Sequence, residues 1–186
     1  MGPAVIVVLV LVLISLIWWI AVYNRITNLK NTTKESWSDI DVELKRRYDL
    51  IPNLVETVKG YAKHEQETLE RVVKLRTNAM QNQGSAESQG RDESQLGLAM
   101  KTLFAVAEGY PELKSDANFR VLQEELAITE DRIAASRRFF NGNVRDLRNI
   151  LQAFPTSIVG NSMQVEMPTF FELDDESERV VPRVDV

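Results

Sequence analysis

Few side chains in this chain could do chemistry, because its 186 residues include one histidine and no cysteine. His64 opens the sequence HEQET, and a zinc-protease helix would need a second histidine where Thr68 stands. A di-iron site in a helical bundle would need two Glu-x-x-His pairs, yet Tyr61 lies three residues before His64. We therefore expect His64 to be exposed or hydrogen-bonded rather than a metal ligand.

Motifs for covalent catalysis and phosphate binding are missing as well. The sequence has no G-x-S-x-G nucleophile elbow, no G-x-x-x-x-G-K-[ST] loop and no G-x-G-x-x-G fingerprint. The absence of cysteine excludes a disulfide scaffold, a thiolate metal site and a cysteine nucleophile. Closely spaced carboxylates such as Asp39 and Asp41 diverge on a helix and are typical of solvated faces. The sequence predicts a protein that is not an enzyme and has no metal or cofactor.

The charges are unevenly distributed. Lysine and arginine number 22 against 27 aspartates and glutamates, giving a net charge of −5 and an isoelectric point near 5.1. That balance argues against a nucleic-acid partner, which would require a dominant basic face. The first ionisable side chain is Arg25, so the chain opens with a wholly uncharged leader.

The leader has the length and composition of a transmembrane helix. Residues 4–22 contain one polar side chain, Ser15, and would form a helix about 28 Å long, close to the thickness of a bilayer's hydrocarbon core. Trp18, Trp19 and Tyr23 gather at its C-terminal end, where aromatic rings favour the membrane interface. Membrane lipid is therefore an expected partner.

A retained anchor fits this leader better than a cleaved signal. Its N-terminal residues carry no basic group, its apolar core is long, and no small-residue cleavage site comes after it. Arg25, Lys30 and Lys34 come directly after the span. The positive-inside rule then predicts the N-terminus outside and the remaining domain in the cytoplasm.

Four helical stretches are expected, the first of them continuous with the leader. Apolar and small residues recur at intervals of three and four until Pro52, which is expected to end this helix. A second helix is predicted from Pro52 to Gln81, a loop over 82–94, a third helix over 92–108, and a fourth from Ser115 or Asp116 to Phe154. Gly60 inside the second helix predicts a close approach to a neighbouring helix. The stripe on the first helix consists of Ile26, Leu29, Thr33, Trp37, Ile40, Leu44, Tyr48 and Ile51.

These stretches predict an all-α fold: a transmembrane helix that continues into an antiparallel four-helix bundle, and then an irregular C-terminal tail. The predicted division is an anchor over 1–23, a bundle over 24–155 and a membrane-proximal tail over 156–186. In such a bundle the fourth helix returns towards the membrane. The last 15 residues carry six acidic side chains, so we expect the end of the tail to be mobile.

Several segments of the sequence match those of a known family. They are Tyr23-Asn24, Trp37-Ser38, the block from Leu44 to Ala62, His64-Glu65, Tyr110 to Lys114, Arg138 to Asn141, Phe154-Pro155 and Phe170 to Glu172. On these segments the chain resembles the LemA family over essentially its whole length. One departure is visible: relatives usually have a Gly-Phe element after their Phe-Pro pair, where this chain has Ile158-Val159-Gly160.

The resemblance implies a bacterial single-pass protein of the cytoplasmic (inner) membrane with a helical bundle and no established enzyme activity. Two basic groups are candidate contacts. Lys45, Arg46 and Arg47 either pair with nearby acids or form a docking patch for a protein partner. Arg145 and Arg148 either form surface ion pairs or contact anionic headgroups.

Aromatic residues near the end of the chain suggest a further surface. Phe139, Phe140, Phe154, Phe170 and Phe171 either pack in the core or form a membrane-proximal patch for a transmembrane partner or a second copy. The leading interpretation is a non-catalytic interaction or scaffold module at the bacterial envelope, binding other membrane proteins. The alternative is a protein that self-assembles through its long last helix and organises or shapes membranes. A carboxylate-dependent hydrolase is the least favoured hypothesis.

Overall fold

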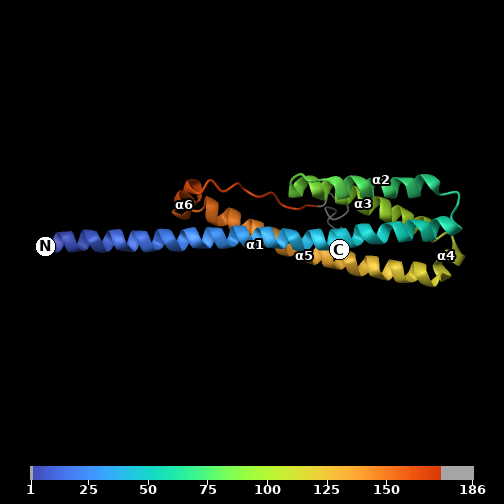
Figure 1. Ribbon diagram of the computed structural model, residues 1–186, viewed down its shortest axis with the longest axis horizontal. Helices are drawn as coiled ribbons and strands as arrows, with labels where there is room; N and C mark the ends of the chain where they lie inside the picture. Colours follow the sequence, from blue (N-terminus) through green and yellow to red (C-terminus); the bar gives the residue numbers. More distant parts are fainter. Residues whose placement is uncertain (1, 173–186) are drawn as a thin grey trace, which may run out of the picture. The chain divides into compact units, whose positions relative to one another are not determined.

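The structure, a computed structural model, describes residues 2–172 as helices joined by short connections, with no strand among them (Figure 1). The all-helical class and the long apolar N-terminal helix are thus confirmed. Residues 173–186, which include the predicted mobile end, lie outside the described residues. The helices are α1 (Pro3–Tyr61), α2 (Gln66–Gln81), α3 (Ala86–Ala107), α4 (Pro111–Ser115), α5 (Ala117–Gln152) and α6 (Thr156–Ser162).

The first helix does not end at Pro52, as the sequence predicted, but runs on to Tyr61. Proline lacks the N–H that would donate to the carbonyl of Tyr48 one turn earlier. In the structure Nε of Arg76, on α2, donates to that carbonyl at 2.6 Å. The side chain of Arg76 therefore replaces the missing backbone hydrogen bond, and the helix continues through the proline.

The boundaries of α2 and α3 also differ from the prediction. The turn between α1 and α2 falls at residues 62–65, so the predicted second helix from Pro52 was wrong in its first half. The predicted loop over 82–94 shrinks to 82–85, because Ser85 caps α3: its hydroxyl accepts a hydrogen bond from the backbone N–H of Ser88 at 3.2 Å. The tail was predicted without helix, yet α6 occupies its first residues.

The described chain divides into two compact units. Residues up to Ser38 join Arg138–Pro168 in one, here called the N-terminal unit. Asp39–Arg137 join the segment that begins at Thr169 in the other, here called the central unit. Both α1 and α5 contribute to each unit. The predicted anchor, bundle and tail remain predictions, since this division reflects contacts within the chain rather than a membrane.

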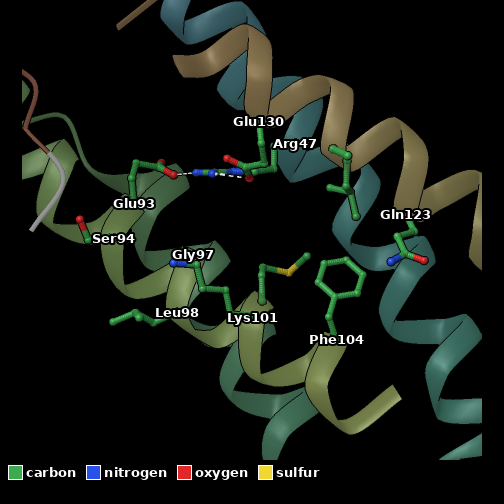
Figure 2. A pocket seen from close by; sticks show the side chains of 12 residues that line it. Arg47, Glu93, Ser94, Gly97, Leu98, Lys101, Phe104, Gln123 and Glu130 are labelled. Atoms are coloured by element: carbon green, nitrogen blue, oxygen red, sulfur yellow. Dashed lines mark hydrogen bonds and ion pairs between the residues drawn. The ribbon is translucent and has the colours of Figure 1, made fainter. Parts of the chain in front are cut away.

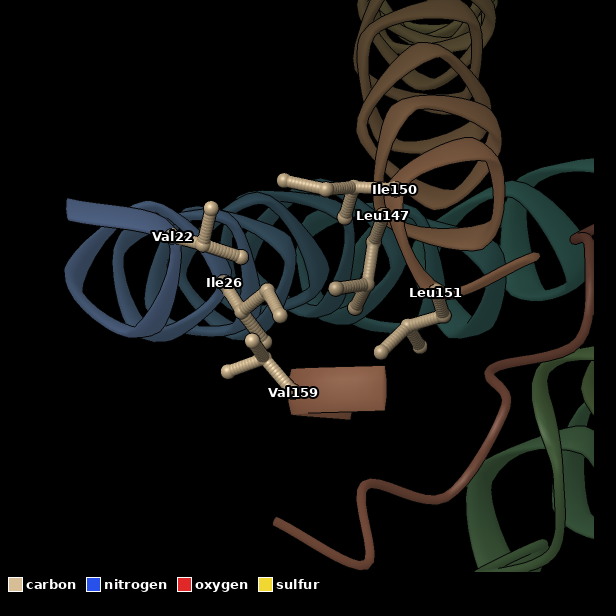
Figure 3. Packing of buried hydrophobic residues seen from close by; sticks show 6 residues of the cluster. All are labelled: Val22, Ile26, Leu147, Ile150, Leu151 and Val159. Atoms are coloured by element: carbon tan, nitrogen blue, oxygen red, sulfur yellow. The ribbon is translucent and has the colours of Figure 1, made fainter. Parts of the chain in front are cut away.

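The N-terminal unit has an aliphatic core where α1, the end of α5 and α6 meet (Figure 3). Val22 and Ile26 come from α1, and Val159 of α6 packs on them. Trp37 of α1 stacks against Phe140 of α5, with ring centroids 5.2 Å apart. The core is made of Val22, Ile26, Leu147, Ile150, Leu151 and Val159.

The central unit contains four long helical segments, from α1, α2, α3 and α5, and the short α4. Tyr61 bonds Asp116 while Arg47 bonds Glu130, so residue numbers rise along α1 as they fall along α5. The apolar residues that recur at intervals of three and four on each helix are buried, as their spacing predicted. Gly60, by contrast, has no heavy atom within 4 Å of the position a Cβ would take, so the predicted close helix approach is wrong. The principal buried side chains are Leu44, Ile51, Leu54, Val58, Leu69, Val72, Leu96, Leu103, Leu113, Phe119, Leu126 and Ile133.

The last described residues pack on α3. Phe171 is fully buried, and the backbone of Glu172 lies against Gly90. A Cβ at residue 90 would collide with the carbonyl oxygen of Glu172. Gly90 is therefore the one glycine of α3 whose missing side chain allows another stretch of backbone to approach.

Candidate functional site

The central unit buries a charged cluster among its helices. Arg47, 4% exposed, forms ion pairs with Glu93 of α3 and with Glu130 of α5, the latter at 2.7 Å (Figure 2). Tyr48 donates its hydroxyl hydrogen to Glu93, and Gln89 donates to the same carboxylate oxygen at 3.0 Å. Both oxygens of Glu93 are therefore engaged, which suits a tie between helices better than a free catalytic base.

Burial sets the acidity of Tyr48. Removal from water disfavours the charged phenolate and raises the pKa of Tyr48 to about 12, although the neighbouring Arg47 acts to lower it. The hydroxyl therefore stays protonated at neutral pH and remains a hydrogen-bond donor. This donor helps to satisfy Glu93 inside the bundle.

A cavity of about 420 Å³ adjoins the charged cluster. Figure 2 shows Arg47, Glu93 and Glu130 at one end, with Phe104 further along the cavity. Most of its lining comes from α3 and α5 and is apolar. Its shape and chemistry would accept a small, largely apolar group.

The N-terminal unit exposes its apolar segment completely. Every residue from Gly2 to Ala21 is exposed, and burial begins at Val22, which is 8% exposed. Within residues 2–172 this is the single helix long and apolar enough to cross a membrane. Trp18, Trp19 and Tyr23 are also exposed, as rings that meet a membrane interface would be.

The end of α5 and the turn after it lie beside the first residues beyond this segment. Leu151 of α5 and Gly160 of α6 adjoin Ile26 of α1. Directly after α5 comes Phe154, which is 84% exposed. The return of the last long helix towards the apolar segment, expected from the sequence, is seen within this unit.

Comparison with known proteins settles the family. The sequence model of the LemA family matches residues 36–186, four fifths of the chain. This chain belongs to the LemA family. It is also similar to Protein LemA of Metamycoplasma hominis (strain ATCC 23114), with 23% identity over 163 residues that cover 88% of this chain and 72% of the relative.

In this LemA-family chain the three basic residues that were predicted to form a patch differ in their exposure to solvent. Lys45 is exposed, Arg46 is partly exposed and pairs with Glu125 at 2.6 Å, and Arg47 is buried. The acids that pair with Arg46 and Arg47 lie on α3 and α5 rather than on α1 itself. Of the three, Lys45 alone offers its charge on the surface.

The predicted membrane contacts are divided between the units. Arg145 is exposed, with Asp146 at 3.9 Å, and Arg148 is partly buried; both lie on α5 in the N-terminal unit with Phe154. Phe171 is buried in the central unit, where Phe170 precedes it. Phe171 is therefore part of a core, whereas Phe154 is exposed.

His64 lies exposed in the turn between α1 and α2. Within residues 2–172 no group of histidine and carboxylate side chains has the arrangement of a metal site. This position agrees with the interpretation of His64 as an ordinary surface histidine.

Sequence reasoning missed the partners that α3 contributes to the charged cluster, the donor Gln89 and the acceptor Glu93. Gln89 fell in the predicted loop, and Glu93 at the predicted start of the third helix. The signal that could have revealed them is their spacing, since Gln89, Glu93, Leu96 and Met100 recur at intervals of three and four. Two polar residues on an otherwise apolar stripe indicate buried polar partners.

Proposed function

We propose that this protein is a single-pass, non-catalytic interaction module of the bacterial cytoplasmic membrane, which holds its central unit in the cytoplasm for contact with other membrane proteins. One observation carries the proposal: the exposed apolar residues from Gly2 to Ala21 have no protein cover, and a bilayer is the surrounding that suits them. Membership of the LemA family supports the same assignment. Arg25, Lys30 and Lys34 directly beyond the segment support a cytoplasmic position for the rest of the chain.

The absence of catalysis is part of this proposal. The chain has a single histidine, and in the central unit Arg47 and Tyr48 occupy both oxygens of Glu93. Such groups fix helices relative to one another. A rigid bundle with a defined surface is what a scaffold presents to its partners.

Photo-crosslinking in intact membranes tests the proposal. A photoreactive amino acid would replace Lys45 or Val42, which are both exposed on the same helix, and Val72, which is fully buried, would serve as the control. We expect covalent adducts with other membrane proteins from the first two positions and none from the third. Absence of any adduct from either exposed position would contradict an interaction role.

Self-assembly is a second candidate function, favoured by one feature of α5. Within the central unit, Val121 and Ile128 are exposed and lie seven residues apart, which places them on one face of the helix. Exposed apolar residues at this spacing are typical of helix pairing. Crosslinks between two copies from these positions, but not from Arg120 on another face, would favour this candidate, as would rings or tubes seen by electron microscopy of the protein in lipid.

A further inference from the structure

We propose that the corner between α5 and α6 inserts into the membrane interface, so that the protein holds the bilayer at a second point besides its N-terminal helix. The corner is the stretch from Gln152 to Ile158, in which the turn over residues 153–155 joins the two helices. The inference rests on the proposed membrane anchoring and adds a partner, the lipid surface, for a part of the chain far away in sequence.

The corner exposes large apolar side chains that the rest of its unit does not cover. Phe154 is 84% exposed, more than any large apolar side chain of the apolar segment itself. Ile158, in the first turn of α6, is 51% exposed. Exposed aromatic and aliphatic groups of this size are costly in water and favourable at a lipid interface.

The depth of the corner in the bilayer follows from the residues of α1 that pack beside it. Val159, directly after Ile158, packs on Val22 and Ile26 in the core of the N-terminal unit (Figure 3). Val22 is the last residue of the apolar stretch, so it lies at the boundary of the hydrocarbon when that stretch spans the bilayer. The corner therefore sits at the headgroup level, within reach of the acyl chains.

Polar groups lie beside the corner as well. A groove of about 430 Å³ runs between α1, α5 and the start of α6, and Arg25, Asp146, Asn149 and Thr156 contribute to its lining. Ala153 of the corner also lines this groove. A polar lining with charges of both signs beside exposed apolar side chains suits the interface, where headgroups and acyl chains meet.

Spin labels can measure this insertion, because the absence of cysteine makes each introduced cysteine unique. Full-length Phe154→Cys and Ile158→Cys proteins would be labelled and reconstituted in phosphatidylcholine vesicles that contain phosphatidylglycerol. Accessibility to oxygen, which concentrates in lipid, is compared with accessibility to a water-soluble nickel chelate. The matched control is Phe139→Cys, another exposed phenylalanine of the same unit, which lies on α5 about 20 Å before the end of that helix.

We expect labels at 154 and 158 to be more accessible to oxygen than to the nickel chelate, and the label at 139 not to be. Greater accessibility to the nickel chelate at both corner positions would overturn the inference. Protection from both reagents would also overturn it, since it would mean that protein, such as a second copy, covers the corner. A label at Val12 separates the failure of this inference from the failure of the proposed anchoring. If the label at 12 is accessible to oxygen but the labels at 154 and 158 are not, the insertion of the corner is rejected and the membrane-spanning helix is supported.

Discussion

The two units of this LemA-family protein both bury apolar side chains between their helices, but they differ in the polar groups that they bury. The N-terminal unit joins α1, α5 and α6 through six buried aliphatic side chains, and its buried polar residues Thr33 and Ser36 bond within their own helix, as Thr33 donates to the carbonyl of Leu29 at 2.7 Å. The central unit also has an apolar core, and in addition it links α1, α3 and α5 through Arg47, Glu93 and Glu130.

The difference shows what each unit must achieve. Aliphatic packing is non-directional and tolerates the apolar surroundings expected around the N-terminal unit. Buried ion pairs add little net stability, but each charge requires its partner and so opposes other registers of the helices. The central unit, which we propose presents the interaction surface, is thereby held in one arrangement.

The largest effect on stability is expected from Arg47→Met, which removes the buried cation of the central unit. Loss of the guanidinium leaves Glu93 buried without its counter-charge, so we expect the free energy of unfolding to fall by about 3–5 kcal/mol. The measurement is denaturant unfolding of the full-length protein in detergent, monitored by circular dichroism.

Two variants serve as controls for this prediction. Arg46→Met removes the same charge from a pair with Glu125 that is about 40% exposed on both sides, and it should cost about 1 kcal/mol or less. The double variant of Arg47→Met with Glu93→Met should be more stable than Arg47→Met alone. An equal loss from Arg46→Met and Arg47→Met would contradict the structural role of the buried cluster.

In the N-terminal unit the matching experiment is Ile26→Ala. Ile26 is fully buried in the aliphatic core, and truncation of such a side chain typically costs about 2–5 kcal/mol because a cavity remains. The fluorescence of Trp37, which packs on Phe140, reports on this unit once Trp18 and Trp19 are replaced by phenylalanine. Leu29→Ala, at a half-buried position, should cost less; a larger loss there would show that the core is elsewhere.

The ionisation of Tyr48 gives a further difference between the units, because the aliphatic core of the N-terminal unit contains no group that titrates. Its pKa of about 12 lies above the value of 10 in the unfolded chain. Tyr48 therefore contributes stability that is complete below pH 10 and is lost as the pH rises through 12. Absorbance at 295 nm should show a tyrosine ionisation near pH 12 that Tyr48→Phe removes, while Tyr61 and Tyr110, whose pKa values are also raised, contribute equally in both proteins. Its persistence in the variant would assign it to another residue.

The smallest expected effect concerns Gly142, inside α5 in the N-terminal unit. A Cβ at this position has no heavy atom within 4 Å, so Gly142→Ala should raise the free energy of unfolding by about 1 kcal/mol through helix propensity alone. Gly160→Ala is the contrasting variant, because its Cβ would lie 2.7 Å from Cδ2 of Leu151. A gain at both positions would mean that α5 and α6 pack less closely than described.

Much of the fold could be predicted from the sequence, since apolar spacing reports directly on the buried face. The stripe that includes Ile26, Ile40 and Ile51 is buried as predicted. Local rules failed where distant residues intervene. Arg76 supplies the hydrogen bond that Pro52 lacks, and neither residue reveals the other in the sequence.

The candidate site was harder to predict for the same reason. Arg47 looked like part of an exposed basic run, because its partners Glu93 and Glu130 lie 46 and 83 residues away. Phe154 and Phe171 looked alike in the sequence, but one is exposed and the other is buried against α3. Only the tertiary arrangement distinguishes a side chain that completes the core from one that is offered to a partner.

The most direct test of the proposed anchoring is whether residues 4–22 cross a membrane and hold the rest of the chain inside the cell. Single cysteines at Gly2 and at the exposed Asn118 would be treated with a membrane-impermeant maleimide in bacterial spheroplasts. We predict that the cysteine at 2 reacts in intact spheroplasts and the cysteine at 118 reacts only after lysis. Reaction at 118 in intact spheroplasts, or recovery of the protein in the soluble fraction, would contradict the anchored, cytoplasmic arrangement.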